Sequence, residues 1–165
     1  MYFTQDKKKA NLFMPTIEEL IKTKPITDPY ARAMLNIIYT GSWLVNNVNQ
    51  TLKPHGITEP QYNVLRILRG QNGEAMNLFE IQNRMLQRMS NVSRLIDKLL
   101  DKGLVERKEC EENRRMVDIR ITQAGLSLLE TVEVPLAAHM NNMSTKLKKE
   151  HAAQLAQWLD ALHDD

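Results

Sequence analysis

"RMSNVSRLIDKLLDKGLVERKECEENRRMVDIRIT", residues 88–122, changes its apolar spacing half-way along. Its first half carries apolar residues at the i, i+3, i+4 and i+7 spacing of one helix face: Val92, Leu95, Ile96 and Leu99. Gly103 follows and predicts the end of this helix. In the second half, "LVERK" and "MVDIRIT" flank a polar loop, and the apolar residues of the latter alternate as in a half-buried strand. The stretch therefore predicts one short helix followed by a β-hairpin.

Two further helices are predicted upstream, each opening with the residues of a capping box. Thr58 and Gln61 open the first, and Asn77 and Glu80 open the second, which we expect to be short. In such a box the two side chains satisfy backbone N–H groups that the first helical turn leaves free. Both helices are therefore expected to begin at defined positions.

A tight turn at residues 87–89 separates the short second helix from the helix of the opening stretch. Two short helices joined by a tight turn and followed by a hairpin form a winged helix-turn-helix, which we place at about residues 57–122. The major groove of DNA admits one α-helix, and the hairpin can reach across the backbone toward the adjacent minor groove. The order of elements therefore favours DNA binding, although an amphipathic helix and a hairpin can equally be plain core elements.

Long helices are predicted on both sides of this region. Apolar residues recur from Met34 at steps of four and three, and a second stripe of Leu35, Tyr39 and Trp43 follows a neighbouring face. A helix with two apolar faces needs two packing partners. We expect a mainly α fold with a small β-hairpin wing and a helical dimerisation region from both termini. The expected divisions are an arm with a short helix at 1–27, one domain at 28–165, and dimerisation helices at about 28–52 and 123–163.

Composition narrows the function less than the motifs do. The formal net charge is only +2, so nucleic-acid binding must depend on where the charges lie. From Arg84 to Thr122 there are 10 Lys and Arg against 7 Asp and Glu, a net of +3. This modest excess keeps open a protein-interaction module without DNA binding. An apolar run of about 20 residues, enough to span a membrane, is not found, and we expect a cytoplasmic protein.

Catalytic and metal sites are not indicated. The sequence shows neither a nucleophile elbow nor a Walker loop, so we expect no enzyme activity. His139, His151 and His163 are 12 residues apart, too far for the i, i+4 pairing of a helical metal site, and we expect no metal or cofactor. The single cysteine, Cys110, lies between Glu109 and Glu111, whose charge should raise its thiol pKa. A redox-sensing regulator using Cys110 stays as an alternative.

The motifs "SNVSRLIDKLLDKGLVER", "ENRR" and "IRITQAG" resemble those of the MarR family of transcriptional regulators, over roughly residues 30–162. The resemblance implies a homodimer with interlocked terminal helices, which supplies the second partner of the two-faced helix. It also implies a regulator, expected to be a repressor, released from a pseudo-palindromic operator by a small ligand. One departure concerns the wing, where the family usually has an aspartate and this chain has Asn113, two positions before Arg115.

We expect DNA contacts from the start of the helix that carries Val92 to Leu99, here called the reading helix, and from the tip of the wing. Asn and Arg can read base edges and Ser usually contacts phosphate, although capping and solvated surface are the alternatives. The candidates are Ser90, Asn91, Ser93, Arg94, Lys98, Arg114 and Arg115.

Two further sets of residues are candidates for ligand binding and for dimerisation. Tyr39, Trp43 and His55 could line a pocket for a small aromatic acid, the ligand class that the resemblance implies, with interface packing as the alternative. The candidate dimer-interface residues are Met34, Ile38, Leu155, Trp158, Leu159 and Leu162.

Overall fold

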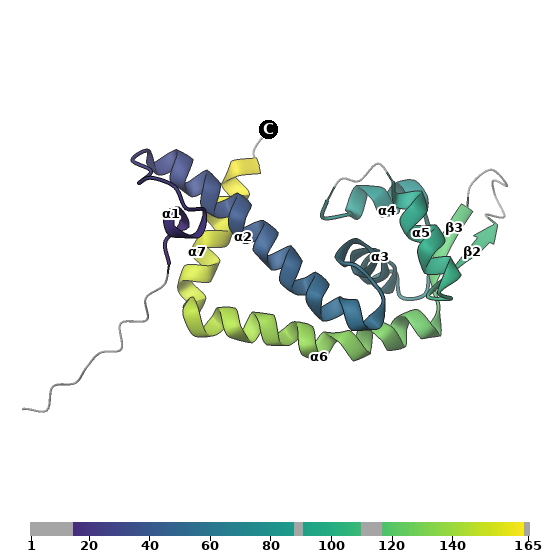
Figure 1. Cartoon of the computed structure of the whole chain (residues 1–165). Helices are drawn as coiled ribbons and strands as arrows, with labels where there is room; N and C mark the ends of the chain where they lie inside the picture. The colour runs from purple at the N-terminus through teal and green to yellow at the C-terminus, as the bar shows by residue number, and fades with distance from the viewer. Residues whose placement is uncertain (1–14, 88–90, 110–116, 164–165) are drawn as a thin grey trace, which may run out of the picture. The chain divides into compact units, whose positions relative to one another are not determined.

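A computed structural model describes residues 15–87, 91–109 and 117–163, except for the side chains of Lys108, Glu109 and Val117. Contacts within the chain divide it into two compact units, Met1–Leu44 and Val45–Asp165. Helix α2 (Pro29–Leu52) runs from the first unit into the second. Figure 1 shows the elements in chain order.

The first unit contains α1 (Ile17–Leu20) and most of α2. Helix α1 opens with a capping box, since Thr16 Oγ1 accepts from Glu19 N–H and Glu19 Oε2 accepts from Thr16 N–H at 2.7 Å. Helix α2 starts at Pro29, because Pro lacks an N–H and suits the first helical position. Arg32 Nε donates to Glu18 Oε1 at 2.8 Å, which ties α1 to the start of α2.

The second unit contains the remaining elements. They follow the end of α2 in this order: η1 (Lys53–His55), α3 (Glu59–Arg69), β1 (Met76–Asn77), α4 (Leu78–Arg84), α5 (Val92–Asp101), β2 (Val105–Glu109), β3 (Val117–Ile121), α6 (Gln123–Lys146), α7 (Lys149–Asp160) and η2 (Ala161–His163). The mainly α fold with a hairpin wing is confirmed. Long helices stand where the 28–52 and 123–163 ranges predicted them.

The hairpin is one part of a three-stranded antiparallel sheet with the order β1-β3-β2. Strand β3 lies in the middle: Ile119 pairs with Arg107 of β2 on one side and with Met76 of β1 on the other. The third strand, β1, was not predicted. It has only two residues, and Asn77 already had a local role in the sequence as the cap of the next helix.

The core of the second unit gathers the predicted apolar faces. All four residues of the helical spacing in α5 are buried, with exposed fractions between 0% for Leu99 and 8% for Leu95. They join buried residues from α3, α4 and α6 and the buried Ile119 and Ile121 of β3. At about 25 cal/mol per Å² of apolar area, each buried side chain of this size contributes roughly 1.5–3 kcal/mol. The buried face of α5 therefore fixes which of its residues point outward.

Helix α6 is joined to the end of the hairpin without any intervening loop. Ile121 ends β3, Thr122 is the N-cap, and Gln123 begins the helix. Thr122 Oγ1 accepts from Gly125 N–H at 3.1 Å and donates to Gly103 O at 2.7 Å, while its N–H donates to Leu104 O at 3.1 Å. These bonds hold the first turn of α6 against the segment between α5 and β2.

Among the described residues, none of the helices is both long enough and apolar enough to cross a membrane.

Candidate nucleic-acid interface

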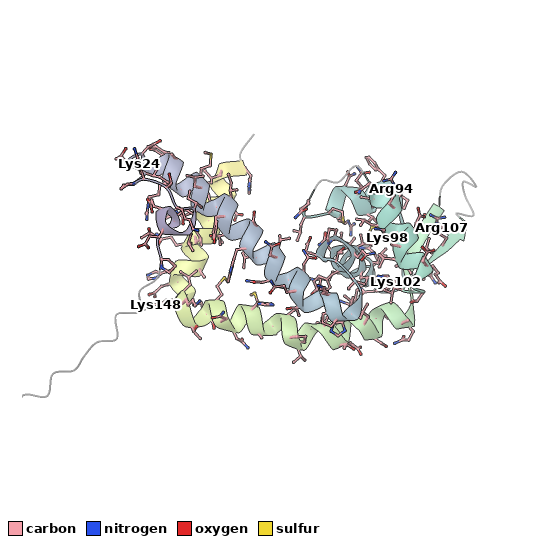
Figure 2. The ribbon with its side chains drawn as sticks, in the orientation of Figure 1. Lys24, Arg94, Lys98, Lys102, Arg107 and Lys148 are labelled. Carbon is pink, nitrogen blue, oxygen red and sulfur yellow. The ribbon has the colours of Figure 1, made fainter. Side chains whose placement is uncertain are left out.

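Helix α5 presents its polar residues on the surface, beside the wing. Asn91 is the N-cap, and Gly103 with φ +66° ends the helical segment in the left-handed conformation that glycine tolerates best. Asn91, Ser93, Arg94 and Lys98 are all exposed, as expected for DNA contacts. Figure 2 shows Arg94 and Lys98 along α5, with Arg94 nearer its N-terminal end. Their role in DNA binding stays a prediction.

The exposed residues of α5 form two neighbouring stripes. Arg94 and Lys98, four residues apart, make a basic stripe. Ser93 and Asp97, also four residues apart, make a second stripe directed at the wing, because Asp97 Oδ1 accepts from Arg107 Nη2 of β2. The predicted candidates therefore lie on both stripes: Arg94 and Lys98 on one, and Ser93 on the other.

A hollow of about 230 Å³ lies between α5, α4 and the sheet. Its lining is apolar apart from Ser93 and Arg107, and the remaining lining residues are Leu78, Ile96 and Ile119. Ser93 thus borders a concave surface between reading helix and wing.

The segment before α5 is fixed to α3 by a buried amide. Asn63, only 8% exposed, accepts a hydrogen bond from Leu86 N–H at 3.1 Å, and Met85 beside it is buried. This anchor holds the end of α4 where the chain turns toward α5. Ser90 itself, in the predicted turn, lies outside the described residues, as do Cys110, Asn113, Arg114 and Arg115.

The predicted ligand-binding residues are distributed over both units. Tyr39 is half-buried and Trp43 is exposed, and both lie on the part of α2 within the first unit. His55 is half-buried in η1 of the second unit. None of the three residues lines the hollow beside α5. The ligand site at Tyr39, Trp43 and His55 therefore stays a prediction.

The predicted dimer-interface residues are mostly exposed. In the first unit, Met34 and Ile38 of α2 are exposed. In the second unit, Leu155 and Trp158 of α7 and Leu162 of η2 are exposed, and Leu159 is half-buried. Trp158 is 61% exposed, and so much apolar surface is typical of a face that a partner covers.

The sequence did not point to Arg107 or to Glu59. Arg107 shares a face of β2 with the buried Val105, and that spacing was the one local signal that it faces inward toward α5. Glu59 lies at the start of α3, where its N–H donates to Asn49 Oδ1 at 2.8 Å, and burial raises the pKa of its carboxyl group.

A metal site is not formed by the residues that the structure describes, because they contain no group of three or more His, Cys, Asp or Glu suited to hold an ion.

Comparisons with known proteins agree with this geometry. The model of the MarR family matches residues 57–117, which include α3, α4, α5 and β2 and end at Val117, the first residue of β3. Over these residues the chain is similar to the MarR family. It is 26% identical over 146 residues to the transcriptional repressor MprA of Escherichia coli strain K12, covering 86% of this chain and 83% of that protein.

Solved structures of MarR proteins share the fold. The structure of a MarR transcription factor from Planctomyces limnophilus matches with a TM-score of 0.64 and 28% identity, covering 83% of this chain and 99% of that one. A mutant MarR from E. coli in complex with operator DNA matches with a TM-score of 0.72 and 20% identity, covering 84% of this chain and all of that one. At that lower identity the likeness shows the fold alone.

Proposed function

We propose that this chain is a sequence-specific DNA-binding transcriptional regulator that acts as a repressor. The observation that carries the proposal is the exposed stripe of Arg94 and Lys98 on α5, a helix whose apolar face is buried and whose flank is joined to a wing. A helix held in this way presents its cations at one end of a rigid unit, as entry into a major groove requires. The MprA relative is itself named a transcriptional repressor.

Residues near the start of α5 would read bases, and the wing would contact the backbone. Arg94 and Asn91 can form bidentate hydrogen bonds with base edges, whereas Ser90, Ser93 and Lys98 would contact phosphate. Arg114 and Arg115 of the wing would reach phosphates or the adjacent minor groove.

A homodimer would place two reading helices on the two halves of a pseudo-palindromic operator, about one helical turn apart. The exposed apolar residues of α2 and α7 would form its interface, with Met34 and Trp158 among them. Residues 28–165 would then act as one domain, with residues 1–27 as an N-terminal arm. The protein would act in the cytoplasm and would have no enzymatic activity.

A small aromatic carboxylate would release the operator. The proposed site uses the aromatic rings of Tyr39 and Trp43, with His55 as a polar group. Packing of these rings in the dimer is the alternative, and titration of an operator complex with aromatic acids distinguishes the two. Weaker operator binding at increasing acid concentration supports the ligand site, and substitution of Trp43 by Leu should then abolish the response.

Selection from random DNA duplexes tests the main proposal. We expect enrichment of one inverted repeat, and an affinity that falls steeply with salt because bound phosphates release counterions. Arg94→Ala should weaken binding to the selected repeat. Lys146→Ala, which removes the same charge from the last turn of α6, serves as the matched control. A selection without any enriched repeat would instead support a winged-helix module that binds another protein.

A further inference from the structure

An ion pair joins the reading helix to the wing. Asp97 of α5 accepts a hydrogen bond from Arg107 of β2, with 2.5 Å between Oδ1 and Nη2. The two side chains are about half exposed, at 55% and 52%. Arg107 pairs with Ile119 of β3, in the middle of the ladder that joins β2, an edge strand, to the central strand β3.

The pair also explains the position of an acidic residue within a basic surface. Asp97 is flanked in sequence by Lys98 and follows Arg94 by three residues. A free carboxylate there would repel DNA phosphates. Because Arg107 neutralises it from the wing side, α5 keeps its basic stripe while the carboxylate faces β2.

A change in the angle of β2 moves the far end of the strand most. Each strand residue adds about 3.3 Å, so a small rotation of β2 about Val105 would displace Glu109, the last residue of the strand, more than Arg107. The core contacts of Val105 and Ile119 fix the base of the hairpin. The hydrogen bond from Arg107 to Asp97 joins the side chains of β2 and α5, and it lies farther along β2 than the buried Val105 does.

We propose that Asp97 and Arg107 form a clamp that sets the angle of the wing against the reading helix, so that both engage one DNA half-site in fixed register. Both are positioning residues, and neither is assigned a contact with a base. The effect on DNA binding rests on the proposed function above, whereas the effect on the wing itself does not.

Hydrogen exchange without DNA tests the clamp directly. We expect Asp97→Asn and Arg107→Gln each to raise the exchange of amides in β2 and β3, on the order of 2–5-fold for an exposed pair. The double variant should show no further increase, since each single change already breaks the same contact. Arg107→Lys should retain part of the protection. The matched control is Asp101→Asn, which removes another exposed carboxylate from α5.

Footprinting on the selected operator provides the second arm. Clamp variants should lose hydroxyl-radical protection where the wing lies, with operator affinity reduced by roughly 2–5-fold, while guanine protection by α5 is retained. Exchange rates in β2 and β3 that match those of Asp101→Asn would overturn the clamp. If the wild-type protein binds no DNA, the proposed function fails. The hydrogen-exchange experiment needs no DNA, so it would still test the clamp.

Discussion

Replacing Gly125 with Ala should destabilise the protein, although alanine normally favours a helix. An added Cβ at this position would lie 2.3 Å from Leu104 O and 2.7 Å from Ile121 Cγ1. The nearer atom is backbone and cannot rotate away, so the first turn of α6 must shift. Such overpacking costs about 1–3 kcal/mol, and weakening the Thr122 cap adds about 0.5–2 kcal/mol. The helix propensity of alanine returns about 1 kcal/mol.

The net expectation is a loss of roughly 0.5–4 kcal/mol, or a Tm lowered by several degrees for a chain of this size. Urea and thermal unfolding at one fixed protein concentration measure it, since dimerisation makes Tm depend on concentration. Gly41→Ala is the matched control, because it lies within α2 and a Cβ there would meet nothing within 4 Å. That variant should be up to about 1 kcal/mol more stable. A Gly125→Ala protein as stable as Gly41→Ala would refute the steric argument.

Four further predictions concern the interface, the wing, the N-terminal segment and the dimer. Arg94→Ala should lower operator affinity by about 1–3 kcal/mol and spare scrambled DNA, and equal losses on both duplexes would exclude a base contact. Arg115→Ala should weaken binding to both duplexes and reduce the salt slope by about one ion per wing, which a salt series measures. The bond from Arg32 lowers the pKa of Glu18 from 4.5 to about 2, so its contribution to stability is full above pH 4.5 and is lost as pH falls through 2. Limited proteolysis of Glu18→Gln should therefore show less acid dependence than wild type. Light scattering should give a dimer mass, and Trp158→Asp should shift it toward the monomer.

The sequence predicted those features that depend on neighbours in the chain. The capping residues of α3 and α4, the buried face of α5 and the pairing of β2 with β3 follow from spacings within a few residues. Because the apolar face of α5 was recognised, the exposure of Arg94 followed at once. Local spacing was therefore sufficient for the reading helix and most of the wing.

Features that depend on distant parts of the chain were not predictable in this way. Strand β1 forms because Met76 and Asn77 pair with β3, about 40 residues later. Two residues are too few to show the alternation of apolar and polar residues that predicts a strand. The direction of Asp97 depends on how β2 packs on α5, which no spacing within the helix reveals. For the same reason, the sequence predicted a DNA contact for Ser93 but did not predict that Ser93 lines the hollow beside the wing.

The direct passage from β3 into α6 limits how this protein can respond to a signal. Thr122 is both the residue after the strand and the cap of the helix. No flexible linker therefore separates the winged helix-turn-helix, here called the reading head, from the first turn of α6. A ligand or partner that tilts this end of α6 must turn the reading head through the same angle. The signal would then change the spacing at which two heads fit their half-sites, and it would leave the preference of each head for its own bases unchanged. Operators with one base pair inserted or removed between the half-sites should therefore differ in how strongly an inducer affects them.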